Sequence, residues 1–283
     1  MSEETASTTI NKTNYVSLVF IVLSYAILAT LVVLAVTVAR GRPMTDTLGL
    51  PEELVAWQAF AIIIAAALVV SIMMRKLKAR VVWELVLGVA LFLGVWFYAW
   101  LLLPTALAVT VAALLTFLQG TVRRAMIHNV FILIGAAGTA LNLAFILEDK
   151  ILILLLVGLA IYDSFAGRPG GMIAQFAASL VHRGLIPGLI IPGRVKDMWA
   201  DIHDAIRRPD ASFLGVGDLI LPMTLVARAS VHGLDRAVIV TLGVLIAAGW
   251  LGSRGPTKPY PALVPLAAGS IIPYILLFLF KQL

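Results

Sequence analysis

Residues 213–222 read Phe-Leu-Gly-Val-Gly-Asp-Leu-Ile-Leu-Pro, an apolar stretch that carries one carboxylate, Asp218. An acid inside an apolar membrane helix is costly, so it usually faces a cavity or a partner and marks a functional site. Gly215 and Gly217 leave little side-chain bulk before it, and Pro222 lacks the N–H that would bond the carbonyl group of residue 218. We therefore expect both the side chain and the backbone of Asp218 to need partners.

The composition of the chain is that of a polytopic membrane protein. Of its 283 residues 61% are hydrophobic and 13% are charged, whereas soluble domains have about 45–50% and about 25%. The apolar runs are long and continuous rather than alternating, which favours helices over a β-barrel. The net charge of +6 fits lysines and arginines that flank membrane spans, so we expect no nucleic acid partner. The chain has no cysteine, which excludes disulfides and thiolate metal sites.

Nine apolar segments can be distinguished, and they predict an all-α, polytopic membrane protein with nine transmembrane helices. Pro104 separates the third segment from the fourth, because one helix of about 38 residues would be nearly twice as long as the bilayer is thick. The nine segments are Tyr15–Ala39, Glu53–Met74, Val81–Leu102, Pro104–Gln119, Ile127–Leu147, Ile151–Ala166, Ser212–Ser230, Arg236–Gly252 and Tyr260–Phe280.

A long connection, Arg168–Ala211, divides the segments into six plus three. We accordingly expect a six-span bundle over 1–166, a partly mobile loop on the cytoplasmic side over 167–211, and a three-span part over 212–283. Within the loop, Met172–Val181 is amphipathic, and Gly184–Gly193 is apolar but interrupted by prolines and glycines. This pattern favours an interfacial helix followed by a mobile linker, and a gate over the site is the alternative.

Lysines and arginines are in modest excess at the span ends that share a side with the N-terminus. Because positive charge stays inside, this asymmetry predicts a multi-pass protein of the cell membrane with a cytoplasmic N-terminus. Nine spans then leave the C-terminus outside.

A second acid, Asp163, lies in the sixth segment. The remaining acids lie in tails, loops or span ends, apart from Glu84, which is one turn from Arg80 and can pair with it. Asp163 lies near the cytoplasmic end of its span, and Asp218 lies about six residues, roughly 9 Å, into the next span. Both carboxylates could therefore meet in the cytoplasmic third of the bilayer, although the sequence also allows Asp163 to reach the interface alone.

Two adjacent carboxylates in a low-dielectric site cannot both ionise easily, so they share one proton. One carboxylate then deprotonates a water molecule that attacks a peptide carbonyl, and the other supports the developing oxyanion. This is the chemistry of an aspartic protease, which needs no metal or other cofactor. The alternative is a proton- or ion-coupled transporter, in which Asp163 and Asp218 relay protons.

A third element opens the ninth segment, which begins Pro-Tyr-Pro-Ala-Leu-Val-Pro at residues 259–265. Three prolines in this short stretch keep the backbone irregular, and irregular backbone at membrane depth is tolerated only beside protein or a watery cavity. We therefore expect the sixth, seventh and ninth segments to converge on one site in the inner leaflet.

Together these motifs resemble those of the presenilin and signal peptide peptidase family, which are intramembrane aspartyl proteases with a GxGD motif. The resemblance implies that Asp163 and Asp218 are the catalytic pair. Because a large loop of the eukaryotic kind is absent and the tails are short, the chain looks more like a microbial presenilin homologue. Val216 stands where the family commonly has leucine. The matching residues are Tyr162-Asp163, Gly215-Val216-Gly217-Asp218 and Pro261-Ala262-Leu263.

The resemblance also implies the partners of the chain: transmembrane peptides or proteins, within a lipid bilayer, and a homo-oligomer is possible. Substrate contacts are expected at Gly215, Gly217 and Pro261–Leu263, where exposed backbone could take up an unwound substrate as an added strand. Tyr162 either contacts substrate or packs against lipid or the core. Asp201-x-His203-Asp204 has metal-ligand residue types, but a solvated helix face is the better interpretation, and no metal is expected.

Overall fold

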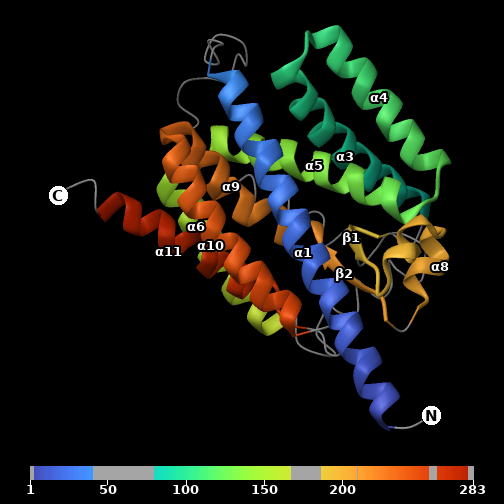
Figure 1. The fold of residues 1–283 in the computed structure, drawn as a ribbon. Coiled ribbons are helices and arrows are strands. Elements are labelled where there is room, and N and C mark those ends of the chain that lie inside the picture. Colours follow the sequence, from blue (N-terminus) through green and yellow to red (C-terminus); the bar gives the residue numbers. More distant parts are fainter. Residues whose placement is uncertain (1–2, 41–79, 167–185, 209, 255–259, 280–283) are drawn as a thin grey trace.

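The computed structural model describes residues 3–40, 80–166, 186–208, 210–254 and 260–279. This part of the chain is mostly helical (Figure 1). Its α-helices are α1 (Glu3–Ala39), α3 (Arg80–Leu102), α4 (Thr105–Thr121), α5 (Ala125–Ile146), α6 (Asp149–Ala166), α8 (Ile202–Ile206), α9 (Val216–His232), α10 (Leu234–Ser253) and α11 (Leu263–Leu279). A short 3-10 helix, η1 (Val195–Trp199), and two strands, β1 (Gly188–Ile191) and β2 (Ser212–Gly215), complete it.

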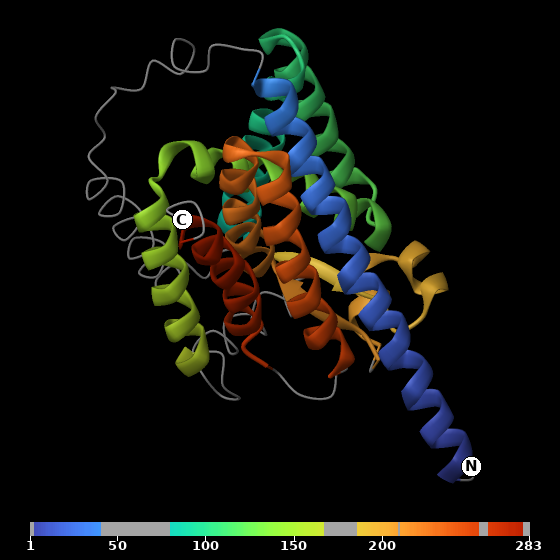
Figure 2. The same cartoon turned by 60° about the vertical axis from the view of Figure 1, so that its left-hand side comes forward.

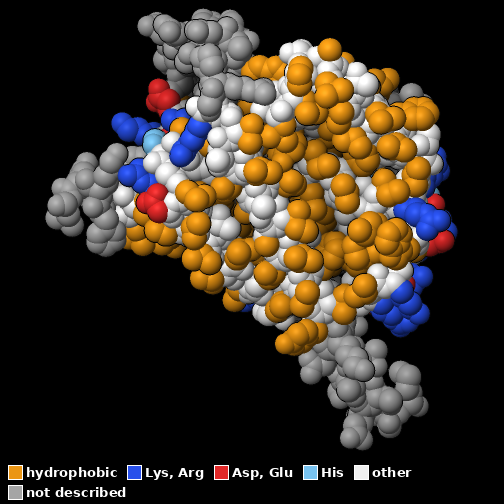
Figure 3. Space-filling model, turned by 45° about the horizontal axis from the view of Figure 1, so that its top comes forward, with side chains coloured by type: hydrophobic (Ala, Val, Ile, Leu, Met, Phe, Trp, Pro, Cys, Tyr) orange, Lys and Arg blue, Asp and Glu red, His pale blue; other side chains and the backbone are white. Residues whose placement is uncertain are grey.

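The surface and the helix lengths indicate a multi-pass membrane protein. By length and composition, four helices of the described part can cross a membrane: α1 from Tyr15 onward, α3 from Trp83 onward, α5 and α10. Helices α4 and α11 are apolar as well, but they are shorter. Figure 3 shows a broad face covered by hydrophobic side chains, with charged side chains gathered at its margins, as expected for a surface in contact with lipid.

Eight of the nine predicted segments overlap a described helix (α1, α3, α4, α5, α6, α9, α10 and α11). The break at Pro104 is confirmed, because α3 ends at Leu102 and α4 begins at Thr105. The predicted second span, Glu53–Met74, and the predicted interfacial helix, Met172–Val181, lie outside the described residues. In the predicted ninth segment, helix α11 begins at Leu263 rather than at Tyr260.

The start of the predicted seventh span is wrong, because residues 212–215 form strand β2 and the helix begins only at Val216. Strand β2 pairs antiparallel with β1, and Leu189 lies opposite Leu214. The interpretation of Gly184–Gly193 as a linker is likewise wrong for β1, all of whose residues are buried. A short apolar segment with prolines and glycines at its ends is compatible with a buried strand as well as with a helix, because its backbone N–H and C=O groups can form hydrogen bonds in either.

The residues around β1 form a compact unit against the N-terminal end of α5. Ala125 N–H donates to the carbonyl oxygen of Ala200 at 3.1 Å, and Ile202 N–H donates to that of Arg123 at 3.0 Å. Within the unit, Arg208 Nη1 donates to the buried carboxylate of Asp197 at 2.5 Å. This unit therefore connects β1, η1 and α8 to the helical bundle.

Helix α5 lies at the centre of the bundle, and α3 packs against it through glycines. A Cβ atom added to Gly138 would lie 1.8 Å from the carbonyl oxygen of Gly94, so the two backbones are in direct contact. Small residues of this kind allow membrane helices to approach closely.

Gly138→Ala is expected to lower the free energy of unfolding by about 1–3 kcal/mol, because the added methyl group forces α3 away from α5. The thermal unfolding midpoint in detergent measures this loss. Gly158→Ala on α6 is the matched control, since a Cβ atom there meets nothing within 4 Å. Equal midpoints for the two variants would contradict the close contact.

Candidate functional site

The two intramembrane acids come from neighbouring helices. Asp163 lies near the C-terminal end of α6, and Asp218 lies in the first turn of α9. Both side chains are partly buried, and their carboxylates are near enough for a direct charge–charge interaction. Because β2 replaces the expected first turn of the span, Asp218 lies closer to the helix start than the predicted six residues.

Asp218 is held through both its backbone and its side chain. The hydroxyl group of Tyr25, from the buried centre of α1, donates to the carbonyl oxygen of Asp218 at 2.8 Å. This is the carbonyl group that Pro222 leaves without a helical partner, so the predicted need for a backbone partner is confirmed. The backbone of Gly215 hydrogen-bonds to the carboxylate, and a Cβ atom on Gly215 would lie 3.1 Å from Asp218 Oδ2. Glycine at 215 thus permits the close approach of the acid.

Tyr25 is a residue of the site that the sequence interpretation missed. Its only local signal is a tyrosine in the middle of an apolar span, where a buried hydroxyl group needs a hydrogen-bond partner. That signal indicates a partner but does not say which helix supplies it.

Asp163 is held by the first turn of α11. The N–H of Leu263 donates to Asp163 Oδ2 at 3.2 Å. The first N–H groups of a helix have no partner within it, and the positive end of the helix dipole lies there, so a carboxylate is stabilised at this position. Ala262 and Leu263 are buried and Pro261 is partly buried. The structure therefore brings the Pro261–Leu263 motif into contact with Asp163.

Two of the proposed substrate-binding residues are exposed. The side chain of Tyr162 is 48% exposed on α6, about 100° around the helix from Asp163. Gly217 is exposed, and nothing lies within 4 Å of a Cβ atom built on it. Both residues face open space, where lipid or a substrate could lie.

A second set of charges joins the other ends of the same helices. Arg228 on α9 donates from Nε to Asp149, the first residue of α6, and from Nη1 to the carbonyl oxygen of Ala144 at 3.3 Å. His232 Nε2 lies 3.6 Å from Asp149 Oδ2, and the hydroxyl group of Tyr274 on α11 interacts with Asp149 and Arg228. Helix α6, at the edge of the bundle in Figure 2, is thus attached at one end by Asp149 and at the other by Asp163.

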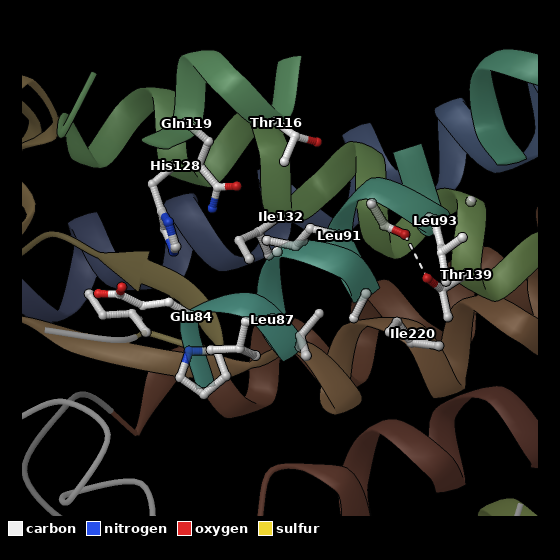
Figure 4. A pocket seen from close by; sticks show the side chains of 18 of the residues that line it. Glu84, Leu87, Leu91, Leu93, Thr116, Gln119, His128, Ile132, Thr139 and Ile220 are labelled. Carbon is white, nitrogen blue, oxygen red and sulfur yellow. Dashed lines mark hydrogen bonds between the residues drawn. The ribbon is translucent and has the colours of Figure 1, made fainter. Parts of the chain in front are cut away.

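A cavity of about 670 Å³ lies between α3, α4, α5, α9 and the unit around β1. Figure 4 shows Glu84, Gln119 and His128 at one end and Leu93 and Thr139 at the other. From α9 it is lined by Val216 and Ile220, which share one face of the helix, whereas Asp218 points about 160° away from both. The two acids therefore lie on the other side of α9 from this cavity.

The residues with metal-ligand side chains do not converge. Among the described residues, no group of three or more histidine, cysteine or acidic residues could hold a metal ion. Asp201 caps α8 by accepting from the N–H of His203 at 2.8 Å, which gives this acid a local structural role.

Neither a protein family model nor a curated protein sequence matches the chain. Its structure is similar to the solved structure of a presenilin family intramembrane aspartate protease, with a TM-score of 0.57 and 19% sequence identity. The match covers 91% of this chain and 94% of that chain. The chain therefore has the fold of that protease over nearly its whole length, as the motifs in the sequence had indicated.

Proposed function

We propose that the chain is an intramembrane aspartic endopeptidase that hydrolyses peptide bonds of transmembrane helices. The observation that carries the proposal is the interaction between Asp163 and Asp218, two acids that come from separate helices and lie near the ends of those helices. The fold similarity to a presenilin family protease supports it.

The pair works with one shared proton. The ionised carboxylate takes a proton from a water molecule as the water oxygen attacks the peptide carbonyl carbon, and the protonated carboxylate donates to the carbonyl oxygen. When the resulting gem-diol intermediate collapses, the C–N bond breaks, the nitrogen takes up a proton from the pair, and one hydroxyl group of the diol returns a proton to the pair as it becomes the new carbonyl group. The pair is singly protonated again after one turnover.

Substrate engages the outer edge of β2 as an added strand. Pro187 accepts from the N–H of Val216 at 3.0 Å, so alternate residues of β2 pair with β1 and Phe213 directs its N–H and C=O groups outward. This edge leads directly into the helix turn that carries Asp218. An unwound substrate bound there by backbone hydrogen bonds would present its peptide bonds to the carboxylates in sequence.

The test is whether the purified chain, alone in detergent, cleaves a transmembrane peptide. We expect two products whose masses add up to the mass of the peptide plus one water molecule. If the peptide stays intact while the chain drives proton-coupled uptake into proteoliposomes, the transporter function replaces the protease.

The proposed orientation puts the N-terminus and the β1–β2 unit in the cytoplasm and the C-terminus outside. Because the chain has no cysteine, single cysteines can test this. Val195→Cys, at a 67% exposed side chain in the unit, is expected to react with a membrane-impermeant maleimide only from the cytoplasmic side. Leu234→Cys, 59% exposed at the opposite end of α9, is expected to react only from outside. The reverse pattern would invert the proposed topology.

A further inference from the structure

Strand β1 is held along the edge that faces away from β2 by two adjacent side chains of α5. Asn129 Oδ1 accepts from the N–H of Ile190 at 2.8 Å, and Asn129 Nδ2 donates to the carbonyl oxygen of Ile190 at 2.8 Å. His128 Nε2 donates to the carbonyl oxygen of Gly188 at 2.9 Å. Only 4% of Asn129 and 5% of His128 is exposed, so both side chains form these hydrogen bonds while buried.

The register of the sheet explains why these atoms need partners. Since Pro187 and Leu189 pair with β2, the N–H and C=O groups of Ile190 and the C=O group of Gly188 point to the opposite edge. A side-chain amide has the same donor and acceptor as a peptide group. Asn129 therefore satisfies Ile190 in the way that one residue of a third strand would.

The two edges of the sheet consequently differ. The edge of β1 is closed by α5, whereas the outer edge of β2 at Phe213 points away from β1, and Phe213 is 43% exposed. Strand β2 continues without a break into α9, which carries Asp218. The register of β1 against β2 therefore also affects the position of the outer edge of β2 relative to Asp218. A strand whose register is not fixed by such contacts is prone to slip.

We infer that Asn129 and His128 are positioning residues: by closing one edge of the sheet and fixing its register against α5, they determine which peptide bond of a substrate on β2 reaches the two acids. The inference rests on the proposed function. The two side chains touch neither acid. The β1 unit is attached independently at the N-terminal end of α5, through the backbone pairs Ala125–Ala200 and Arg123–Ile202. A role in positioning is therefore separable from a role in folding.

Asn129→Asp is the sharpest variant, because it keeps the size of the side chain and the acceptor for Ile190 N–H but loses the donor to Ile190 C=O. We expect it to cut a transmembrane peptide at additional bonds one or two residues from the wild-type position, with the product ratio changed by at least about threefold. Mass spectrometry of the products measures the ratio. A side chain needed only for stability would lower the yield of all products equally.

His128 provides a matched pair of variants. Glutamine can present an N–H donor near the position of His128 Nε2, whereas leucine has a similar volume and no donor. His128→Gln is expected to keep the wild-type product ratio, and His128→Leu is expected to broaden it. The loss of the Asn129 bond is checked without proteolysis by hydrogen exchange in the Asp218→Asn background, where Asn129→Leu is expected to speed exchange of the Ile190 amide.

Wild-type product ratios in both Asn129→Asp and His128→Leu, with the folded yield retained, would overturn the inference while leaving the protease intact. Unchanged exchange at Ile190 in Asn129→Leu would overturn it as well. Failure of the proposed function has a different signature, the absence of any cleavage by the wild-type chain, and it would overturn both.

Discussion

Asp218→Asn is expected to abolish peptide cleavage, with a loss of at least about 10³-fold, and Asp163→Asn is expected to do the same. An amide has nearly the shape of the carboxylate and can still accept from the backbone of Gly215 or Leu263, so the fold should persist. It cannot accept a proton from water, and it cannot share one with the remaining acid. The rate of product formation, measured beside the thermal unfolding midpoint, separates lost chemistry from lost structure.

The double variant provides a further test of the pair. When two acids act as one unit, the effects of their substitutions on the cleavage rate are not additive. The double variant, Asp163→Asn with Asp218→Asn, should therefore cleave the peptide no more slowly than either single variant. Asp235→Asn is the matched control, since Asp235 is exposed at the start of α10, at the far end of α9 from Asp218. Retention of more than about a tenth of the wild-type rate by either site variant would exclude a shared-proton mechanism.

Arg228→Leu is expected to lower the free energy of unfolding by about 2–4 kcal/mol, because it leaves the Asp149 carboxylate without its strongest partner. The loss lies below that of a fully buried pair, since 24% of the Arg228 side chain and 20% of the Asp149 side chain is exposed. The loss of this ion pair should also lower the cleavage rate. Helix α6 carries Asp163 roughly 21 Å from Asp149, so an untethered start of α6 displaces the acid at its other end.

The thermal midpoint and the cleavage rate measure the two effects of Arg228→Leu. Asp149→Arg combined with Arg228→Asp restores opposite charges and should recover part of both. The control is Arg236→Leu, which removes an arginine that has no ion pair among the described residues. If Arg228→Leu behaves like this control, the Asp149–Arg228 pair contributes nothing to the position of α6.

Much of the architecture could be predicted from the sequence because membrane helices are determined by local properties. The length of an apolar run decides whether a segment can cross the bilayer, and Pro104 breaks a run wherever the neighbouring helices lie. The unpaired carbonyl group of Asp218 was predictable for the same reason, since Pro222 removes its donor within the same turn. The contact of the Pro261–Leu263 motif with Asp163 also agrees with the predicted convergence of three segments.

Only the tertiary structure decided how Ser212–Gly215 is used, which residue pairs with the Asp218 carbonyl group, and how α6 is attached. A short apolar stretch is compatible with a helix turn or a buried strand, and β2 is a strand because β1 lies beside it. Tyr25 and Arg228 are distant in sequence from the groups that they bind. Hydrogen bonds and ion pairs between helices depend on how the helices pack, and no local pattern in the chain specifies that packing.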